Sequence, residues 1–130
     1  MPIIAATLQS CGAIYYAKAE KLNNELIVRK TEFIYIKKDR TETRTYVLVE
    51  TVELAFPICL QKSGEETYTA LLMTCTHRGC ELNYGGGIYS CPCHGSEFSK
   101  EGVVLDGPAD KNLKSFKTKT DSENIYILLS

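Results

Sequence analysis

The sequence predicts an all-β domain, folded as an antiparallel β-sandwich or barrel. Short segments rich in β-branched and aromatic residues follow one another along the chain, and turn-like clusters separate them. No long stretch has the 3.6-residue period of an amphipathic helix. Short strands at this spacing are typical of sandwiches and barrels. At 130 residues the chain is long enough to bury one core by itself.

In order, seven segments are predicted as strands: residues 25–30, 32–38, 45–56, 67–75, 87–91, 115–120 and 124–130. The clearest alternation is in the third, where Val52, Leu54 and Phe56 alternate with Thr51, Glu53 and Ala55, so we expect a half-buried strand there. Turns are expected at 37–44, 61–66, 84–87 and 106–112, because these clusters are turn-like in composition. Only the first twenty or so residues could hold a helix.

The chain begins with the small and apolar stretch MPIIAATLQSCG. It is similar to the end of a signal peptide's apolar region, although a charged segment before it is missing. LQSC also resembles a bacterial lipobox, whose cysteine, here Cys11, carries a lipid anchor. The other interpretation is a loose terminus with an incidental cysteine. We therefore expect an N-terminal segment over 1–20 and one folded domain over 21–130.

The composition argues against two classes of partner. The formal net charge is −1, with acidic and basic residues mixed along the chain, so no nucleic-acid partner is expected. No apolar run approaches the roughly 18 residues that span a bilayer. Any membrane tether would then depend on a lipid at Cys11, and one lipid chain alone anchors weakly.

Residues 75–98, CTHRGCELNYGGGIYSCPCHGSEF, contain both histidines and four of the six cysteines. They form two half-sites, Cys75-x-His77 and Cys91-x-x-His94, and each half-site supplies one thiolate and one imidazole. Two cysteines and two histidines could bind zinc. A structural zinc finger, however, usually takes its cysteine pair from one loop and its histidine pair from another. The mixed spacing matches the Rieske arrangement, in which two histidines hold one iron and two cysteines the other.

On CTHRGC, CPCHGSEF and GPA, the chain resembles Rieske iron–sulfur proteins, specifically the soluble head of the quinol-oxidising kind in cytochrome bc-type complexes. These motifs cover about residues 69 to 110, and the resemblance implies a cluster-binding subdomain of two loops over about 70–110. It also implies a [2Fe–2S] cluster with Cys75 and Cys91 on one iron and His77 and His94 on the other. The alternative outside this family is a zinc-stabilised binding module.

The resemblance further implies a disulfide between Cys80 and Cys93 that joins the two loops. Rieske ferredoxins of low potential lack this pair, so these two residues select the high-potential subclass. A covalent tie is physically reasonable, because the connection between the loops contains three glycines and would not hold them at a fixed distance. A lasting disulfide indicates an oxidising compartment. We expect an exported protein on the periplasmic or cell-envelope side of a bacterial membrane.

Residues around the ligands carry further expectations from the resemblance. Ser96 corresponds to a serine that donates a hydrogen bond to a cluster sulfide, which raises the potential. Phe98 stands where high-potential relatives have a tyrosine, so one donor is missing and a lower potential is expected. Gly107 and Pro108 belong to the stretch that resembles the family's proline loop. Gly79, Gly95 and Gly107 are expected to let the backbone approach the cluster and to adopt conformations closed to other residues.

Two residues limit the functional interpretation. Arg78 stands where quinol-oxidising members usually have leucine, and its guanidinium would change the docking surface near the histidines. Cys59 is interpreted as a buried strand cysteine and not as a ligand.

The expected function is one-electron transfer between protein partners. One use is as the Rieske subunit of a quinol–cytochrome c reductase-type complex, with quinol, a cytochrome b-type complex and a c-type cytochrome as partners. The other is as a freestanding Rieske ferredoxin or small subunit that serves another oxidoreductase, such as an arsenite oxidase or an oxygenase.

Overall fold

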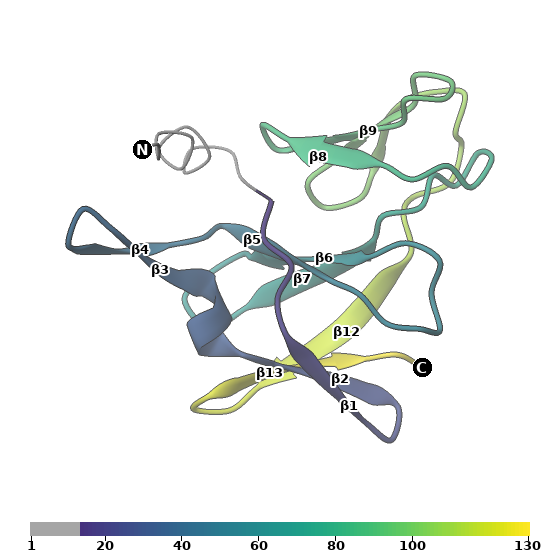
Figure 1. Ribbon diagram of the computed structural model, residues 1–130. Coiled ribbons are helices and arrows are strands. Elements are labelled where there is room, and N and C mark those ends of the chain that lie inside the picture. Colours follow the sequence, from purple (N-terminus) through teal and green to yellow (C-terminus); the bar gives the residue numbers. More distant parts are fainter. Residues whose placement is uncertain (1–13) are drawn as a thin grey trace.

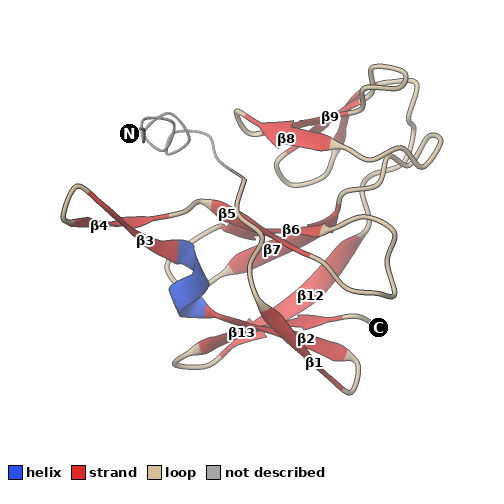
Figure 2. Ribbon diagram, viewed as in Figure 1, coloured by secondary structure: helices blue, strands red, loops and turns tan. Residues whose placement is uncertain are grey.

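The structure is a computed structural model that describes residues 14–130. Within these residues, three antiparallel sheets contain nearly all of the regular structure, and the only helix is a short 3-10 turn, η1 (Lys30–Phe33). The prediction of an all-β antiparallel fold is confirmed. Figure 2 shows the strands in red and the single helical turn in blue.

The largest sheet has seven strands in the order β1-β2-β13-β12-β7-β6-β5. Their bounds are β1 Ala19–Leu22, β2 Glu25–Arg29, β13 Asn124–Leu128, β12 Ser115–Thr120, β7 Tyr68–Leu72, β6 Ile58–Lys62 and β5 Tyr46–Val49. Apolar side chains from both halves of this sheet pack together in one buried core, with Phe33 of η1 among them. Leu26, Val28, Val47 and Ile58 are almost fully inaccessible.

Residues 15–17 close this sheet on itself. The Ala17 N–H donates to the Leu48 carbonyl at 2.8 Å, and the Leu48 N–H donates to the Tyr15 carbonyl at 2.9 Å. The same stretch of chain then continues into β1, which pairs with β2 at the opposite edge. The chain therefore pairs with β5 at one edge of the sheet and then forms β1, the strand at the other edge, which closes the sheet into a barrel (Figure 1).

A second, four-stranded sheet has the order β11-β10-β9-β8, and we call it the small sheet. Its strands are β8 Asn83–Gly85, β9 Ile88–Ser90, β10 Glu97–Ser99 and β11 Val104–Asp106. In Figure 1, β8 and β9 lie apart from the barrel, above β5 and β6. A second buried core fills the junction, and Leu48, Cys59 and Leu71 of the barrel pack there with Tyr89 and Phe98. Strands β5 to β7 are therefore buried on both faces.

The third sheet is a hairpin of β3 (Ile34–Lys37) and β4 (Arg40–Thr43). The sequence indicated a turn over 37–44, but the reversal itself takes only Lys38 and Asp39, both with positive φ of 51° and 66°. The Arg44 guanidinium lies between the Tyr15 and Tyr35 rings, 3.8 and 4.8 Å from their centroids. This stacking attaches the hairpin to the segment that closes the barrel.

The prediction of a strand over 45–56 is wrong in its second half. Strand β5 ends at Val49, and Val49 pairs with Ile58 in the antiparallel register of β6. The chain must therefore reverse between these two residues, and 50–57 forms the connecting loop. Val52 is 98% exposed there, while Leu54 is half-buried against the barrel core. The apolar alternation in this stretch belongs to a loop.

Residues 14–130 contain no helix that is long and apolar enough to cross a membrane.

Candidate metal centre

The four cysteines and two histidines of the sequence motif lie on two loops at one end of the small sheet. Loop 75–80 runs from β7 to β8, and loop 91–96 connects β9 to β10. In each loop a residue donates back to the first cysteine: Gly79 N–H to the Cys75 carbonyl at 2.8 Å, and Gly95 N–H to the Cys91 carbonyl at 2.9 Å.

Each first cysteine also donates its own N–H across the loop. Cys75 N–H donates to the Cys80 carbonyl, and Cys91 N–H donates to the Ser96 carbonyl, both at 2.8 Å. The two loops therefore have the same backbone hydrogen-bond pattern. Their side-chain order differs, because the histidine is two residues after the cysteine in the first loop and three residues after it in the second.

Two of the three glycines meet the conformational expectation. Gly79 and Gly95 have φ values of 78° and 85°, in a region that residues with a side chain rarely adopt. An added Cβ would meet no atom within 4 Å at either position, so backbone conformation, not space, requires glycine there. Gly107 has no such positive φ and does not need glycine for that reason.

A disulfide joins Cys80 to Cys93, with an S–S distance of 2.08 Å, and it ties the two loops together. This is the pairing that the sequence resemblance implied. Cys91 Sγ lies within 4.8 Å of both disulfide sulfurs. That group of three cysteines is no metal site, however, because the disulfide sulfurs of Cys80 and Cys93 cannot act as thiolate ligands.

The two remaining loop cysteines, Cys75 and Cys91, are free and buried, at 2% and 3% exposure. Burial raises the pKa of the Cys91 thiol, but hydrogen bonds from the His94 and Cys93 backbone N–H groups and from the Cys75 thiol lower the pKa below its ordinary value overall. Donors that already favour a thiolate suit a metal-bound sulfur.

The two histidines face each other from the two loops. Their ring centroids are 5.1 Å apart, and the rings are perpendicular. His94 is exposed and His77 is half-buried. His77 Nδ1 is the one buried side-chain nitrogen or oxygen among residues 14–130 that has no hydrogen-bond partner. A buried imidazole nitrogen usually has a partner, so a metal ion at this position would satisfy it.

Cys75, His77, Cys91 and His94 therefore fit a [2Fe–2S] cluster by the chemistry of their donors. Two are buried free thiols, and His77 directs an unsatisfied nitrogen inward. The same donor types would also suit zinc, so the donors alone leave the metal open.

The loop that contains Gly107 and Pro108 is connected to both ligand loops. The Ala109 N–H donates to Ser96 Oγ at 2.9 Å, and the Thr76 hydroxyl donates to the Lys111 carbonyl at 2.7 Å. Ser96 is fully buried. Its oxygen accepts from Ala109, so its hydroxyl hydrogen is available for another acceptor.

Phe98 and Arg78, the other two residues singled out in the sequence, lie in different surroundings. Phe98 is fully buried in β10 and packs in the same core as Cys75 and Cys91. Arg78 is exposed at the turn of the first loop, and it forms no ion pair with any residue in 14–130. Cys11, the candidate lipidation site, lies outside the described residues.

Cys59 is a fully buried free thiol in β6, away from the ligand loops in the sequence. Burial raises its pKa to about 12, so the thiol is neutral at physiological pH.

Sequence reasoning missed one buried polar residue near the site. Gln61 lies on β6 at 7% exposure and contacts both Tyr84 and Tyr89 of the small sheet. Its only signal in the sequence is a polar residue directly after the apolar run ICL.

Comparison with known proteins agrees with this geometry. The family profile described as "Rieske [2Fe-2S] domain" matches residues 32–117. The cytochrome b6-f complex iron-sulfur subunit of Synechococcus sp. (strain JA-2-3B'a(2-13)) is 40% identical over 65 residues, which are 48% of this chain and 38% of that protein. The cytochrome b6-f complex iron-sulfur subunit 1 of Nostoc sp. (strain PCC 7120) is 30% identical over 116 residues, which are 83% of this chain and 59% of that protein.

Among solved structures, the plasma membrane Rieske protein PetC3 from Synechocystis PCC 6803 is similar with a TM-score of 0.55 and 32% identity, over 64% of this chain and 85% of that one. The chain spans 38% and 59% of the lengths of the two subunits named above. The matched profile covers both ligand loops, the small sheet and strands β5 to β7 of the barrel. The chain therefore belongs to the Rieske [2Fe–2S] family, and its cofactor is a [2Fe–2S] cluster.

Proposed function

We propose that Cys75 and Cys91 hold one iron of the cluster and that His77 and His94 hold the other. The observation that carries this assignment is that only two of the four loop cysteines are free thiols. The other two are consumed in the Cys80–Cys93 disulfide, which leaves one buried thiol and one imidazole on each loop. The unsatisfied Nδ1 of His77 supports the same assignment.

The protein acts as a one-electron carrier. When bound, the cluster supplies reversible one-electron chemistry. The chain contributes the surroundings: the buried cysteine side excludes water, and the exposed His94 leaves an edge at which a partner can approach. Ser96 has a free hydroxyl hydrogen, and a donor of this kind stabilises the more negative reduced state.

The chain serves as the head of a quinol-oxidising complex. Two observations support this use: the relatives named as cytochrome b6-f subunits, and the disulfide that the ferredoxins of low potential lack. Its partners would be a cytochrome b-type complex with its quinol on the donor side and a c-type cytochrome on the acceptor side.

A second use is as a freestanding carrier or as the small subunit of another oxidoreductase. Arg78 favours it, because an exposed guanidinium without a partner suits a protein surface that carries carboxylates better than it suits an apolar quinol.

The protein is exported and lies on the envelope side of a bacterial membrane, and Cys11 carries a lipid. The disulfide supports an oxidising compartment. Cell fractionation and palmitate labelling test both parts. Incorporation of label that is lost in Cys11→Ser supports the lipid, and equal labelling of both forms rejects it.

Metal analysis tests the ligand assignment. Protein purified from iron-replete cells should contain two irons and two acid-labile sulfides per chain, the composition of the cluster. Cys75→Ser and His94→Ala should abolish the visible absorption, because each removes a ligand. The control Cys59→Ser should keep it, because Cys59 is a buried thiol outside both loops. Stoichiometric zinc in place of iron would reject the cluster.

Purification from the native membrane tests the parent complex. Co-purification with a b-type cytochrome, and reduction of the cluster by a quinol in that preparation, supports the quinol-oxidising use. Recovery without any b-type haem, together with rapid reduction by a protein donor, supports the second use instead.

A further inference from the structure

Gln61 is the one polar side chain of the barrel strands that is buried under the small sheet. It lies near the end of β6, and its exposed fraction is 7%. Its neighbour Leu60 points into the barrel core, so Gln61 points the other way, to the junction with the small sheet. A buried amide is costly unless its hydrogen bonds are made.

Three hydrogen bonds satisfy the Gln61 amide. Nε2 donates to the Tyr89 hydroxyl at 2.6 Å and to the Lys100 carbonyl at 2.9 Å. Oε1 accepts from the Tyr84 hydroxyl at 3.1 Å. All three partners lie outside the barrel.

These three partners come from three of the four chain segments that lead to or from the ligand loops, and the fourth segment is β7 of the barrel itself. Tyr84 is on β8, which leaves loop 75–80. Tyr89 is on β9, which enters loop 91–96, and Lys100 directly follows β10, which leaves the same loop. A single side chain of the barrel therefore bonds to β8, to β9 and to the residue that follows β10, the three segments of the small sheet that adjoin a ligand loop.

The surroundings of these bonds are aromatic, and the bond between Gln61 and Tyr89 is buried. The Tyr84 and Tyr89 rings are 4.3 Å apart, and Tyr46 of β5 packs edge-on against Tyr84 at 4.8 Å. Tyr89 is fully buried. Hydrogen bonds at such a site specify one arrangement, because any other arrangement leaves buried groups unpaired.

The disulfide and Gln61 act at different places. The disulfide joins the two ligand loops to each other, but it does not attach either loop to the barrel. We propose that Gln61 is a positioning residue that fixes the small sheet, and with it both ligand loops, in one orientation against the barrel. The consequence for the cluster rests on the ligand assignment proposed above, whereas the consequence for the small sheet does not.

Gln61→Met tests the proposal, because methionine has a similar length and makes none of the three bonds. Lys62→Met is the matched control: the next residue of β6 receives the same replacement, and its amine reaches only the Glu65 carbonyl and the Tyr68 ring. Tyr84→Phe removes one partner hydroxyl and is a milder variant should Gln61→Met fold poorly.

The first readout is amide hydrogen exchange in the cluster-loaded protein. In Gln61→Met, exchange in 81–90 and 97–101 should accelerate about tenfold or more, since one buried hydrogen bond is worth about that factor in a local opening equilibrium. Exchange in β12 and β13 should stay unchanged. Tyr84→Phe should accelerate exchange only in 81–90. A double variant with Gln61→Met and Tyr84→Phe should exchange no faster than Gln61→Met alone. Uniform acceleration of the whole chain, or none, overturns the proposal.

The second readout separates positioning from stability alone. If the loops lose their single orientation, the electron paramagnetic resonance lines of the reduced cluster should broaden in Gln61→Met and not in Lys62→Met. Unchanged line widths overturn the positioning role. If wild-type protein contains no iron, the ligand assignment fails, and the exchange pattern of the same variants still tests the attachment of the small sheet.

Discussion

His77 and His94 approach each other from different loops, with perpendicular rings and centroids 5.1 Å apart. The hairpin of β8 and β9 separates them in sequence, and the disulfide between Cys80 and Cys93 brings their loops together. Since His77 directs an unpartnered nitrogen inward and His94 is exposed, the pair lies at the boundary between a buried metal site and solvent.

Removing the disulfide should make the cluster labile. Cys80→Ser leaves all four proposed ligands in place but frees the loops, which are tied across 13 residues. A crosslink over a loop of this length is worth about 3 kcal/mol in the chain-entropy treatment. We expect faster loss of visible absorption on warming and a lower reduction potential as water enters. Cys59→Ser is the control, and equal half-lives for both variants would contradict the prediction.

Adding a hydroxyl at position 98 should raise the reduction potential. Phe98 is fully buried in the core that also contains Cys75 and Cys91, and Phe98→Tyr is expected to provide a donor near a ligand sulfur. A bond that favours the reduced state by about 1 kcal/mol corresponds to about +40 mV for one electron. Protein-film voltammetry measures the shift. Phe98→Leu changes the packing without adding a donor and should not raise the potential; the same rise in both variants would refute the hydroxyl effect.

Arg78 should attract anionic redox partners. Arg78→Leu removes one positive charge from the first ligand loop, so oxidation of the reduced protein by ferricyanide should slow about threefold to tenfold at low ionic strength. The difference should disappear at high salt. Lys38→Leu makes the same charge change on the exposed β3–β4 turn and should have a smaller effect. If the stopped-flow rates of the two variants are equal, Arg78 lies away from the electron-transfer edge.

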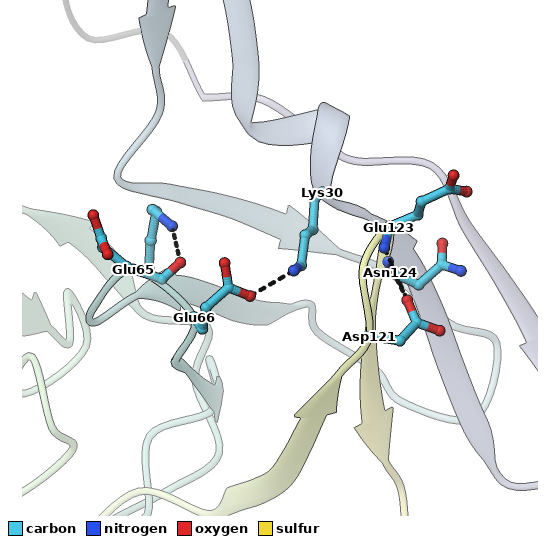
Figure 3. Close-up of polar contacts among 7 residues, drawn as sticks. Lys30, Glu65, Glu66, Asp121, Glu123 and Asn124 are labelled. Carbon is cyan, nitrogen blue, oxygen red and sulfur yellow. Dashed lines mark hydrogen bonds and ion pairs between the residues drawn. The ribbon is translucent and has the colours of Figure 1, made fainter.

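Asp121 should make the barrel sensitive to acid. The Tyr126 hydroxyl and the backbone N–H groups of Glu123 and Asn124 lower the pKa of Asp121 below its ordinary value of 3.8, and Figure 3 shows the carboxylate at this turn. A depressed pKa contributes stability that is fully present above about pH 4 and is lost as the pH falls through the folded-state value.

Asp121→Asn removes this titration. The variant should be less stable than the wild type at pH 7, and the difference should shrink as the pH falls from 4 to 2. Urea unfolding at several pH values measures it. Glu66→Gln is a companion variant, because it breaks the ion pair with Lys30 that lowers the pKa of Glu66, so its loss of stability should also shrink in acid (Figure 3). A wild-type advantage that stays constant down to pH 2 would contradict the assignment.

Much of the site could be predicted from the sequence, because its residues are chemically unusual and close together. Both histidines and four cysteines fall within 75–98, and the spacing alone separates the two half-sites. Gln61 could not be predicted. Its role depends on partners at 84, 89 and 100 that only the tertiary structure brings to it.

The fold was predictable to a similar degree. Strands with five or six residues, such as β2, β7 and β12, have a clear pattern, whereas β8, β10 and β11 have three residues each and are too short to show one. The loop 50–57 was mistaken for a strand, because Val52, Leu54 and Phe56 alternate by chance. The pairing of Val49 with Ile58 excludes a continued strand, and pairing is not visible in one sequence.

The closure of the barrel by residues 15–17 also bears on self-association. An open sheet edge is a template on which a second chain can add a strand. In the described residues this segment occupies the edge of β5, and the outer edge of β1 is only four residues long and carries the exposed charges of Glu20 and Lys21. The barrel therefore offers little backbone for strand addition between molecules, and its contacts with other proteins have to be made by side chains and loops.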